Sequence, residues 1–206
     1  GYLASISYVD YQLGRLLDGL DSSPLKGNTI IILWSDHGFH IGEKQNWEKF
    51  ALWDQTTRVP FFVHAPGVSV DGVRTRQPVT LTDIYPTLCE LAGLPVPKLC
   101  NGNSLVPQLK NPNAIKDEPA LTAFQFWKED KPSLAIADSR YRFIRYGDGF
   151  EELYDLETDP NEFKNLISDP GLVKVKMRLV NSLPRKVMPM QKIPQNSPFH
   201  RGRKRK

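Results

Sequence analysis

Cysteine and long apolar runs are both scarce in this sequence. The 206 residues contain two cysteines, Cys89 and Cys100, and no Cys-x-x-Cys motif. Such a pair is compatible with a disulfide, a metal pair or two buried thiols, and the absence of a paired motif favours buried thiols. No apolar run approaches the roughly 18 residues that a membrane-spanning helix needs. These absences exclude a disulfide-rich scaffold and predict no membrane span.

The body of the chain also lacks an excess of one charge sign. Lysine and arginine number 27 against 23 acidic residues, which gives a net charge of +4. Five of the basic residues lie at the very end of the chain: Arg201, Arg203, Lys204, Arg205 and Lys206. The remainder is near neutral, so we expect no nucleic-acid partner. Residues 186–206 are predicted to form an extended, solvated basic tail.

The first 95 residues show the pattern of an α/β layered domain. Residues 1–20 place apolar side chains at the three-and-four spacing of an amphipathic helix. Two short apolar runs, 29–34 and 59–63, predict strands covered on both faces, as in a parallel sheet. The pair Thr82-Asp83 predicts a capped helix that ends at Gly93. Helix, strand, strand and helix in this order indicate an α/β fold.

From residue 120 onward the chain becomes β-rich and aromatic. Segments such as "SLAIADSRYRFIRYG" and "EELYDLE" are separated by Lys-Pro and Gly-Asp-Gly turn signals, which predicts an antiparallel meander. "TDPNEFKNLISDP" then predicts an acidic capped turn and a short helix, and the last thirty or so residues are expected to be extended. The predicted organisation is an α/β region at 1–130, a small α+β subdomain at 131–185 and the tail at 186–206.

The first apolar run is followed by a carboxylate and an imidazole, two side chains that can bind metals or transfer protons. Asp36 and His37 follow it directly, and ligands of open α/β sheets gather beyond the carboxyl ends of strands. Gly38 and Gly42 would let backbone approach a ligand closely. The carboxylate and imidazole could bind one divalent ion, could act as a base and its orienting partner, or could cap and pack a turn. The two residues alone leave all three readings open.

A longer series of motifs narrows the choice. "SDHG", then Gly42-Glu43, Trp47 and Lys49, then "FALWDQTTRVPFFVHAPG", resembles the sulfatase family of the alkaline phosphatase-like superfamily, nearest to bacterial iduronate-2-sulfatase-like enzymes. "YLASISYVDYQLGRLLDGL", "TLTDIYPTLCELAGLPVP" and "YRFIRYGDGFEELYDLETDPNEFKNL" extend the likeness, in family order, over most of residues 2–166. The resemblance implies an α/β fold. The chain would be the C-terminal part of a sulfatase-type layered sheet domain, with a small antiparallel β-sheet subdomain and a helix.

The resemblance also implies roles for individual residues. Asp36 and His37 look like ligands of the family's single calcium ion, with Asp36 the better suited because calcium prefers oxygen. Lys49 looks like the catalytic lysine whose ammonium binds the substrate's sulfate group. His40 lies three residues from His37 and is expected to line the substrate pocket, although a structural role is its commoner use.

Two substitutions depart from the family pattern. Lys44 and Asn46 occupy places where relatives carry histidines, and either change could alter leaving-group protonation or substrate choice. The larger departure is an absence: no Cys/Ser-x-Pro-x-Arg motif, the source of the family's formylglycine nucleophile, occurs in the sequence. The paired aspartates that complete the calcium shell are missing too. Both are expected in an N-terminal part of the same domain.

The implied activity is that of a sulfuric ester hydrolase acting on a sulfate ester, expected to be that of a small molecule or a sulfated carbohydrate. A phosphodiesterase or phosphonate hydrolase of the same superfamily and a non-catalytic remnant are the alternatives. The resemblance implies a periplasmic or secreted location. The 206-residue chain alone is expected to be inactive, because the nucleophile is missing.

Overall fold

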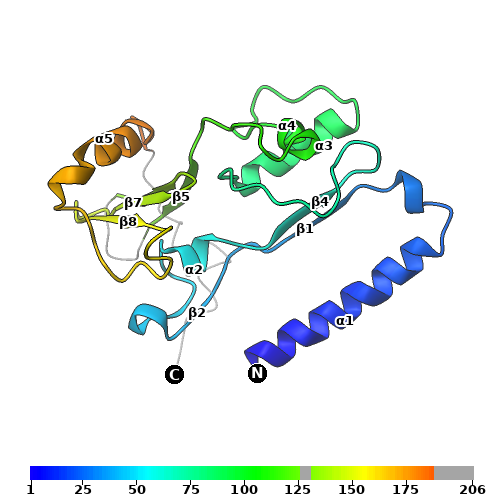
Figure 1. Ribbon diagram of the computed structural model, residues 1–206, viewed down its shortest axis with the longest axis horizontal. Coiled ribbons are helices and arrows are strands. Elements are labelled where there is room, and N and C mark those ends of the chain that lie inside the picture. The colour runs from blue at the N-terminus through cyan, green and yellow to red at the C-terminus, as the bar shows by residue number, and fades with distance from the viewer. Residues whose placement is uncertain (126–130, 188–206) are drawn as a thin grey trace, which may run out of the picture. The chain divides into compact units, whose positions relative to one another are not determined.

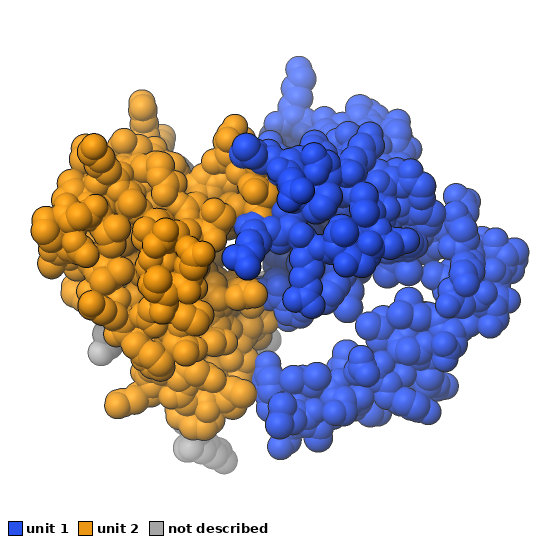
Figure 2. All heavy atoms as spheres, viewed as in Figure 1, with its two compact units in different colours: residues 1–36, 59–76, 80–115 blue, residues 37–58, 77–79, 116–206 orange. Residues whose placement is uncertain are grey.

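The computed structural model describes residues 1–125 and 131–187, which form two compact units (Figure 2). Unit 1 comprises residues 1–36, 59–76 and 80–115, and unit 2 comprises residues 37–58, 77–79 and those from 116 onward. Residues 37–58 are predicted to belong to the first domain, whereas by their contacts they belong to unit 2. The prediction of an extended tail falls largely on residues 188–206, which lie outside the described residues.

Unit 1 begins with the predicted amphipathic helix, α1 (Tyr2–Asp21), which is confirmed (Figure 1). A short 3-10 turn, η1 (Lys26–Asn28), follows it. No residue of α1 is buried, and Leu3 and Leu16 remain 76% and 70% exposed. The apolar stripe of α1 therefore lies open in the described part of the chain, where no helix is long and apolar enough to span a membrane.

Strands β1 (Ile31–Trp34) and β4 (Phe61–His64) run side by side in unit 1 (Figure 1). They pair antiparallel, with Ile31 opposite His64 and Trp34 opposite Phe61. The expectation of parallel strands covered on both faces is wrong for this pair, since β4 alternates between exposed and half-buried residues. A continuous apolar run reports apolar character but not the direction of the partner strand.

The predicted helix after residue 82 is confirmed as η3 (Leu81–Asp83) continuing into α3 (Ile84–Leu91). Its cap lies slightly earlier than predicted: Thr80 and Asp83 form a reciprocal capping box, in which the backbone N–H of Thr80 donates to Asp83 at 2.9 Å. The short helix α4 (Val106–Lys110) follows. Cys89 is buried on α3 and Cys100 is half-buried, and both are free thiols.

Unit 2 is built on the predicted antiparallel meander, which is confirmed. Its four strands pair in chain order: β5 (Ala120–Phe124), β6 (Ser133–Ala137), β7 (Tyr141–Arg145) and β8 (Glu151–Asp155). One face of the sheet packs on the helix α5 (Val173–Asn181), and this core includes Phe143, Leu153 and Leu179, each at most 1% exposed. Burial of such side chains is the main stabilising contribution to a small sheet of this kind.

The helix predicted within residues 158–170 lies further along the chain. Turns and irregular loop occupy that stretch up to residue 169, and the helical residues are η4 (Pro170–Leu172) and α5 (Val173–Asn181). Asp169 caps η4 by accepting a hydrogen bond from the Gly171 N–H at 2.8 Å. The cap and the following proline set the start of the helix, and α5 also replaces part of the extended segment expected near the end of the chain.

Residues 37–58 join unit 2 through a buried anchor. The segment contains β2 (His40–Ile41), η2 (Glu43–Gln45), β3 (Trp47–Glu48) and α2 (Asp54–Thr57). Between β3 and α2, Leu52 is completely buried in a cluster with Ala135, Ile144 and Tyr154 of the meander. The second face of the four-stranded sheet is thus covered by the segment that carries the candidate site residues.

Candidate active site

His37 and Lys49 are brought together by the β2–β3 hairpin. β2 and β3 pair antiparallel, with His40 opposite Glu48 and Ile41 opposite Trp47. Lys49 directly follows β3, and its Nζ lies 2.9 Å from Nε2 of His37. Two residues that are twelve positions apart therefore form one polar pair. Lys49 is exposed and His37 is half-buried, so the ammonium lies where a solute can reach it.

The second contact of His37 fixes its tautomer. Nδ1 lies 2.8 Å from the backbone carbonyl oxygen of Gly38, which can only accept a hydrogen bond. Nδ1 therefore carries the proton, and in the neutral ring Nε2 has the lone pair that accepts from Lys49. An ammonium has three N–H donors, and this arrangement uses one of them on the imidazole.

Asp36 lies at the end of β1, in unit 1, and is exposed. Calcium takes six to eight oxygen ligands, and Asp36 fits as one hard oxygen donor. His37 fits less well, because the lone pair of Nε2 already accepts from Lys49. Within residues 1–125 and 131–187, no three histidine, cysteine, aspartate or glutamate side chains lie grouped as a metal site would require. The described residues therefore supply at most part of a calcium shell.

His40 lies inside unit 2. Its side chain is completely buried and contacts the Trp53 ring edge-on, with the centroids 5.8 Å apart. Burial lowers the pKa of His40, which the nearby Glu43 carboxylate opposes, so the neutral ring is favoured. The role of His40 in lining a substrate pocket stays a prediction. The observed surroundings are those of a packed core histidine.

Gly38 serves packing in this structure. Its N–H donates to the Thr56 carbonyl at 2.7 Å, and a Cβ placed on it would lie 2.0 Å from the backbone oxygen of Gln55. That approach is possible only for glycine. Gly38 therefore fixes the chain between His37 and α2, a different use from the close approach to a ligand that the sequence suggests.

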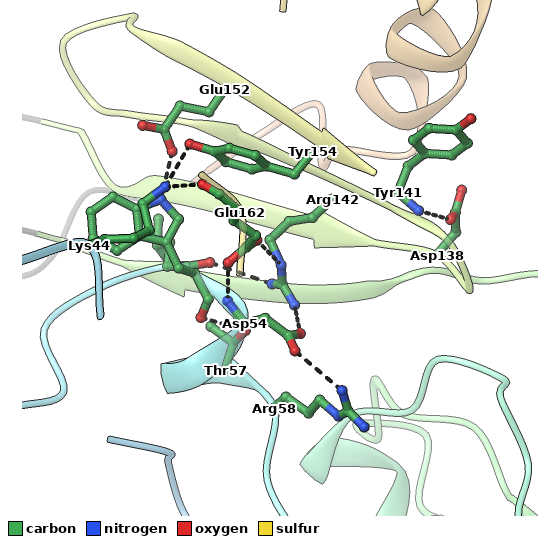
Figure 3. Close-up of polar contacts among 12 residues, drawn as sticks. Lys44, Asp54, Thr57, Arg58, Asp138, Tyr141, Arg142, Glu152, Tyr154 and Glu162 are labelled. Atoms are coloured by element: carbon green, nitrogen blue, oxygen red, sulfur yellow. Dashed lines mark hydrogen bonds and ion pairs between the residues drawn. The ribbon is translucent and has the colours of Figure 1, made fainter. Parts of the chain in front are cut away.

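Lys44 and Asn46, the two departures from the family pattern, both stabilise the hairpin. Lys44 extends toward the meander, where its Nζ donates to the Tyr154 hydroxyl at 3.0 Å and to the Glu162 carbonyl (Figure 3). Asn46 closes the turn through its backbone: its carbonyl accepts from Gly42 N at 3.1 Å, and its N–H donates to the Glu43 carbonyl at 2.9 Å. Neither arrangement resembles that of a proton donor to a leaving group.

A buried ionic cluster beneath the hairpin was not anticipated from the sequence. Arg142 of β7 lies 2.6 Å from an Asp54 oxygen and 3.0 Å from an oxygen of Glu162 (Figure 3). Glu162 also accepts from the Asp54 N–H at 2.7 Å. Burial raises the pKa of Glu162 to about 7, and the charge of Arg142 opposes that rise. The one available signal was an arginine inside the apolar strand "YRFIR".

Comparisons with known proteins identify the family to which this chain is similar. A family model described as Sulfatase matches residues 1–94. A sulfatase of Formosa agariphila is 44% identical over 164 residues, which is 80% of this chain and 31% of the relative. The chain belongs to the sulfatase family. A Δ4,5-hexuronate-2-O-sulfatase of Bacteroides thetaiotaomicron is 34% identical and is matched over 84% of this chain and 38% of the relative.

Solved structures show the same fold. A protein solved with its substrate D-glucosamine-2-N,6-O-disulfate matches with a TM-score of 0.76 and 26% identity, over 87% of this chain and 38% of that protein. The phosphonate monoester hydrolase of Agrobacterium radiobacter matches with a TM-score of 0.74 and 29% identity, over 85% and 38% of the two chains. The chain spans about a third of the length of the relatives it matches.

Proposed function

We propose that this chain forms part of a sulfuric ester hydrolase whose substrate is a sulfated carbohydrate. The observation that carries the proposal is the pairing of Lys49 with His37 in a family of sulfatases. The substrate class is supported by the disulfated glucosamine bound as substrate by one structural relative. The same proposal places the protein in the periplasm or outside the cell, which fractionation of the native host would test.

The chain's own residues stabilise charge in this mechanism. His37, protonated on Nδ1, orients the Lys49 ammonium through Nε2, and the other N–H donors of Lys49 are directed to the oxygens of the sulfate group. A compact ammonium suits a tetrahedral oxyanion, and its stabilisation grows as charge moves onto those oxygens in the transition state. Lys49 therefore acts as an electrostatic catalyst.

Calcium and the nucleophile belong to the same proposal. Asp36 would hold a calcium ion through its carboxylate, with His37 beside it, and other parts of the domain would supply the remaining ligands. The ion would neutralise charge on the sulfuryl oxygens. A formylglycine from the family motif would supply the attack on sulfur, since neither Cys89 nor Cys100 lies in that motif.

The test is hydrolysis of an aryl sulfate by the protein expressed from its complete reading frame. Replacing Lys49 with alanine should lower kcat/KM by roughly 10²–10³-fold, the usual loss of one oxyanion donor. Lys174→Ala is a matched control, because Lys174 is an exposed lysine on α5 of the same unit. Unchanged turnover in Lys49→Ala would contradict the role of Lys49.

Phosphonate ester hydrolysis is the second candidate, favoured by the likeness to a phosphonate monoester hydrolase. Both substrates present a tetrahedral anionic centre to Lys49, so the site residues alone do not separate them. The ratio of kcat/KM for an aryl sulfate and an aryl phosphonate monoester does. The proposed function expects the sulfate to be the better substrate, and the opposite ranking would replace it.

A further inference from the structure

The turn that leads to Lys49 has an unusual backbone. Among the described residues, four that are not glycine have positive φ: Lys44 at 54°, Gln45 at 58°, Glu48 at 74° and Glu162 at 56°. Lys44 and Gln45 lie on the β2–β3 turn, and Glu48 is the last residue of β3. Non-glycine residues persist in this conformation only where surrounding contacts hold them. Something outside the turn must therefore fix its shape.

Lys44 provides that contact. Its Nζ lies 4.3 Å from the centroid of the Trp53 ring and 4.4 Å from that of Tyr154. It also donates to the Tyr154 hydroxyl at 3.0 Å and to the Glu162 carbonyl (Figure 3). Burial lowers the pKa of Lys44, and the carboxylates of Glu152 and Glu162 oppose that shift. The aromatic faces, the hydroxyl and the carbonyl together suit an ammonium.

The residues that contact the Lys44 ammonium are held in place by further contacts of their own. The Trp53 indole N–H donates to Glu152 at 2.8 Å, and Tyr154 is only 2% exposed on β8. Glu162, the fourth residue with positive φ, is tied through its carboxylate to the Asp54 N–H and to Arg142. The two strained backbone positions therefore meet in one contact, with Lys44 on the turn and Glu162 opposite it. This contact joins the turn to the rigid meander.

A displacement of the β2–β3 turn would move Lys49 directly. Lys49 lies five residues after Lys44 and immediately after β3, and only two residue pairs hold β3 to β2. With so short a ladder, the position of Lys49 relative to His37 depends on the shape of the turn. A misplacement of about 1 Å in a catalytic group can cost on the order of 10²-fold in rate.

We propose that Lys44 is a positioning residue for Lys49: its ammonium, held by Trp53, Tyr154 and the Glu162 carbonyl, fixes the β2–β3 turn so that Lys49 meets His37. The inference rests on the proposed function of Lys49. It also assigns a use to the lysine that replaces a histidine of the family pattern. That use is structural support of the site, since the Lys44 ammonium is directed into the meander.

A double-mutant cycle tests whether Lys44 acts through Lys49. In the protein expressed from its complete reading frame, Lys44→Met should lower kcat/KM for an aryl sulfate by about 10–100-fold. In a Lys49→Met background the same change should have almost no further effect, because the group it positions is already gone. Lys174→Met, at an exposed position of the same unit, should stay within about twofold of wild type.

Additive losses in the cycle, or a Lys44→Met variant with normal turnover, would overturn the proposal. Hydrogen exchange of the backbone amides of residues 42–49 gives a second measurement that does not depend on activity. Lys44→Met should accelerate exchange there, and Lys174→Met should leave it unchanged. If the wild-type protein cleaves no sulfate ester, the proposed function fails and exchange alone decides: unaltered protection in Lys44→Met would refute the support role.

Discussion

Lys44 and Lys49 lie five residues apart and experience opposite environments. Lys49 is exposed, with its ammonium against an imidazole nitrogen. Lys44 is half-buried between two aromatic rings, and burial lowers its pKa. A solvated ammonium can bind an incoming anion, whereas one enclosed by ring faces and a carbonyl stabilises the fold. At the scale of the residue, environment separates the roles of two identical side chains.

Asp36 allows a residue-scale prediction about metal. In the protein expressed from its complete reading frame, Asp36→Ala should lose calcium and activity together, because the remaining ligands bind a cation less well without one charged oxygen. Asp36 is exposed at the end of a strand, so folding should survive the change. Elemental analysis alongside sulfate release is the measurement, with Asp71→Ala, an exposed aspartate of the same unit, as control. Full calcium content with normal turnover would make Asp36 a turn residue only.

Glu162 gives a prediction about pH. Its pKa is raised by burial from 4.5 to about 7, so the folded state favours the protonated form. The contribution of this group to stability is therefore fully present below about pH 4.5 and is lost as the pH rises toward 7. Glu162→Gln cannot ionise and should flatten the fall in unfolding free energy across that interval. Chemical denaturation of both proteins at several pH values measures it, and identical slopes would count against a raised pKa.

At the scale of the element, the 37–58 segment is shaped by contacts with the meander. Leu52 is completely buried among meander residues, and Arg142 reaches from β7 to Asp54 on α2. The Arg142 side chain is only 6% exposed, and truncating one partner of a buried ion pair leaves the others uncompensated. The 37–58 segment, which carries Lys49, is therefore packed against the small sheet within unit 2.

A substitution at Gly38 tests how closely residues 37–58 are packed. A methyl group at this position would meet the Gln55 carbonyl oxygen at 2.0 Å, and backbone can yield only by moving α2 away from His37. Gly38→Ala should lower the free energy of unfolding by about 1–3 kcal/mol, as overpacking usually does. Gly14→Ala is the matched control: no atom lies within 4 Å of its Cβ, and alanine favours the helix interior by about 0.5–1 kcal/mol. Equal melting temperatures for the two variants would contradict the packing role.

At the scale of the whole molecule, apolar surface and missing chemistry point the same way. The exposed large apolar side chains of α1 include Leu3, Ile6, Val9 and Leu16, and those of the β1–β4 pair include Trp34 and Phe62. Apolar side chains gathered on one helix stripe usually contact another protein surface. The sequence also lacks the formylglycine motif. The matched segment is 31% and 38% of two relatives, and the rest of their length has room for both a covering layer and a nucleophile.

The isolated 206-residue chain should therefore associate at high concentration and show no sulfatase turnover. Light scattering over a concentration series measures association, and aryl sulfate hydrolysis measures turnover against a Lys49→Ala control. Replacing Leu3 and Leu16 with lysine should reduce association, because both side chains are exposed on α1. A monomer at every concentration, or turnover clearly above the control, would contradict this prediction.

The sequence by itself determined the elements whose signals are local. The spacing of apolar residues specified α1, and turn residues between short β-rich runs specified the meander from β5 to β8. The order of motifs around Asp36, His37 and Lys49 identified the family. These features are readable because periodicity and turn chemistry act over a few neighbouring residues.

Tertiary structure alone decided which surfaces those elements meet. Several features depend on residues that are distant in the chain. They are the antiparallel pairing of β1 with β4, the burial of His40, the packing of residues 37–58 on the meander and the inward direction of Lys44. Gly38 shows why most directly, since the atom that forbids a side chain there belongs to Gln55, across a close approach of two backbone segments. The periodicity of apolar residues indicates that a side chain will be covered, whereas tertiary packing determines which residues cover it.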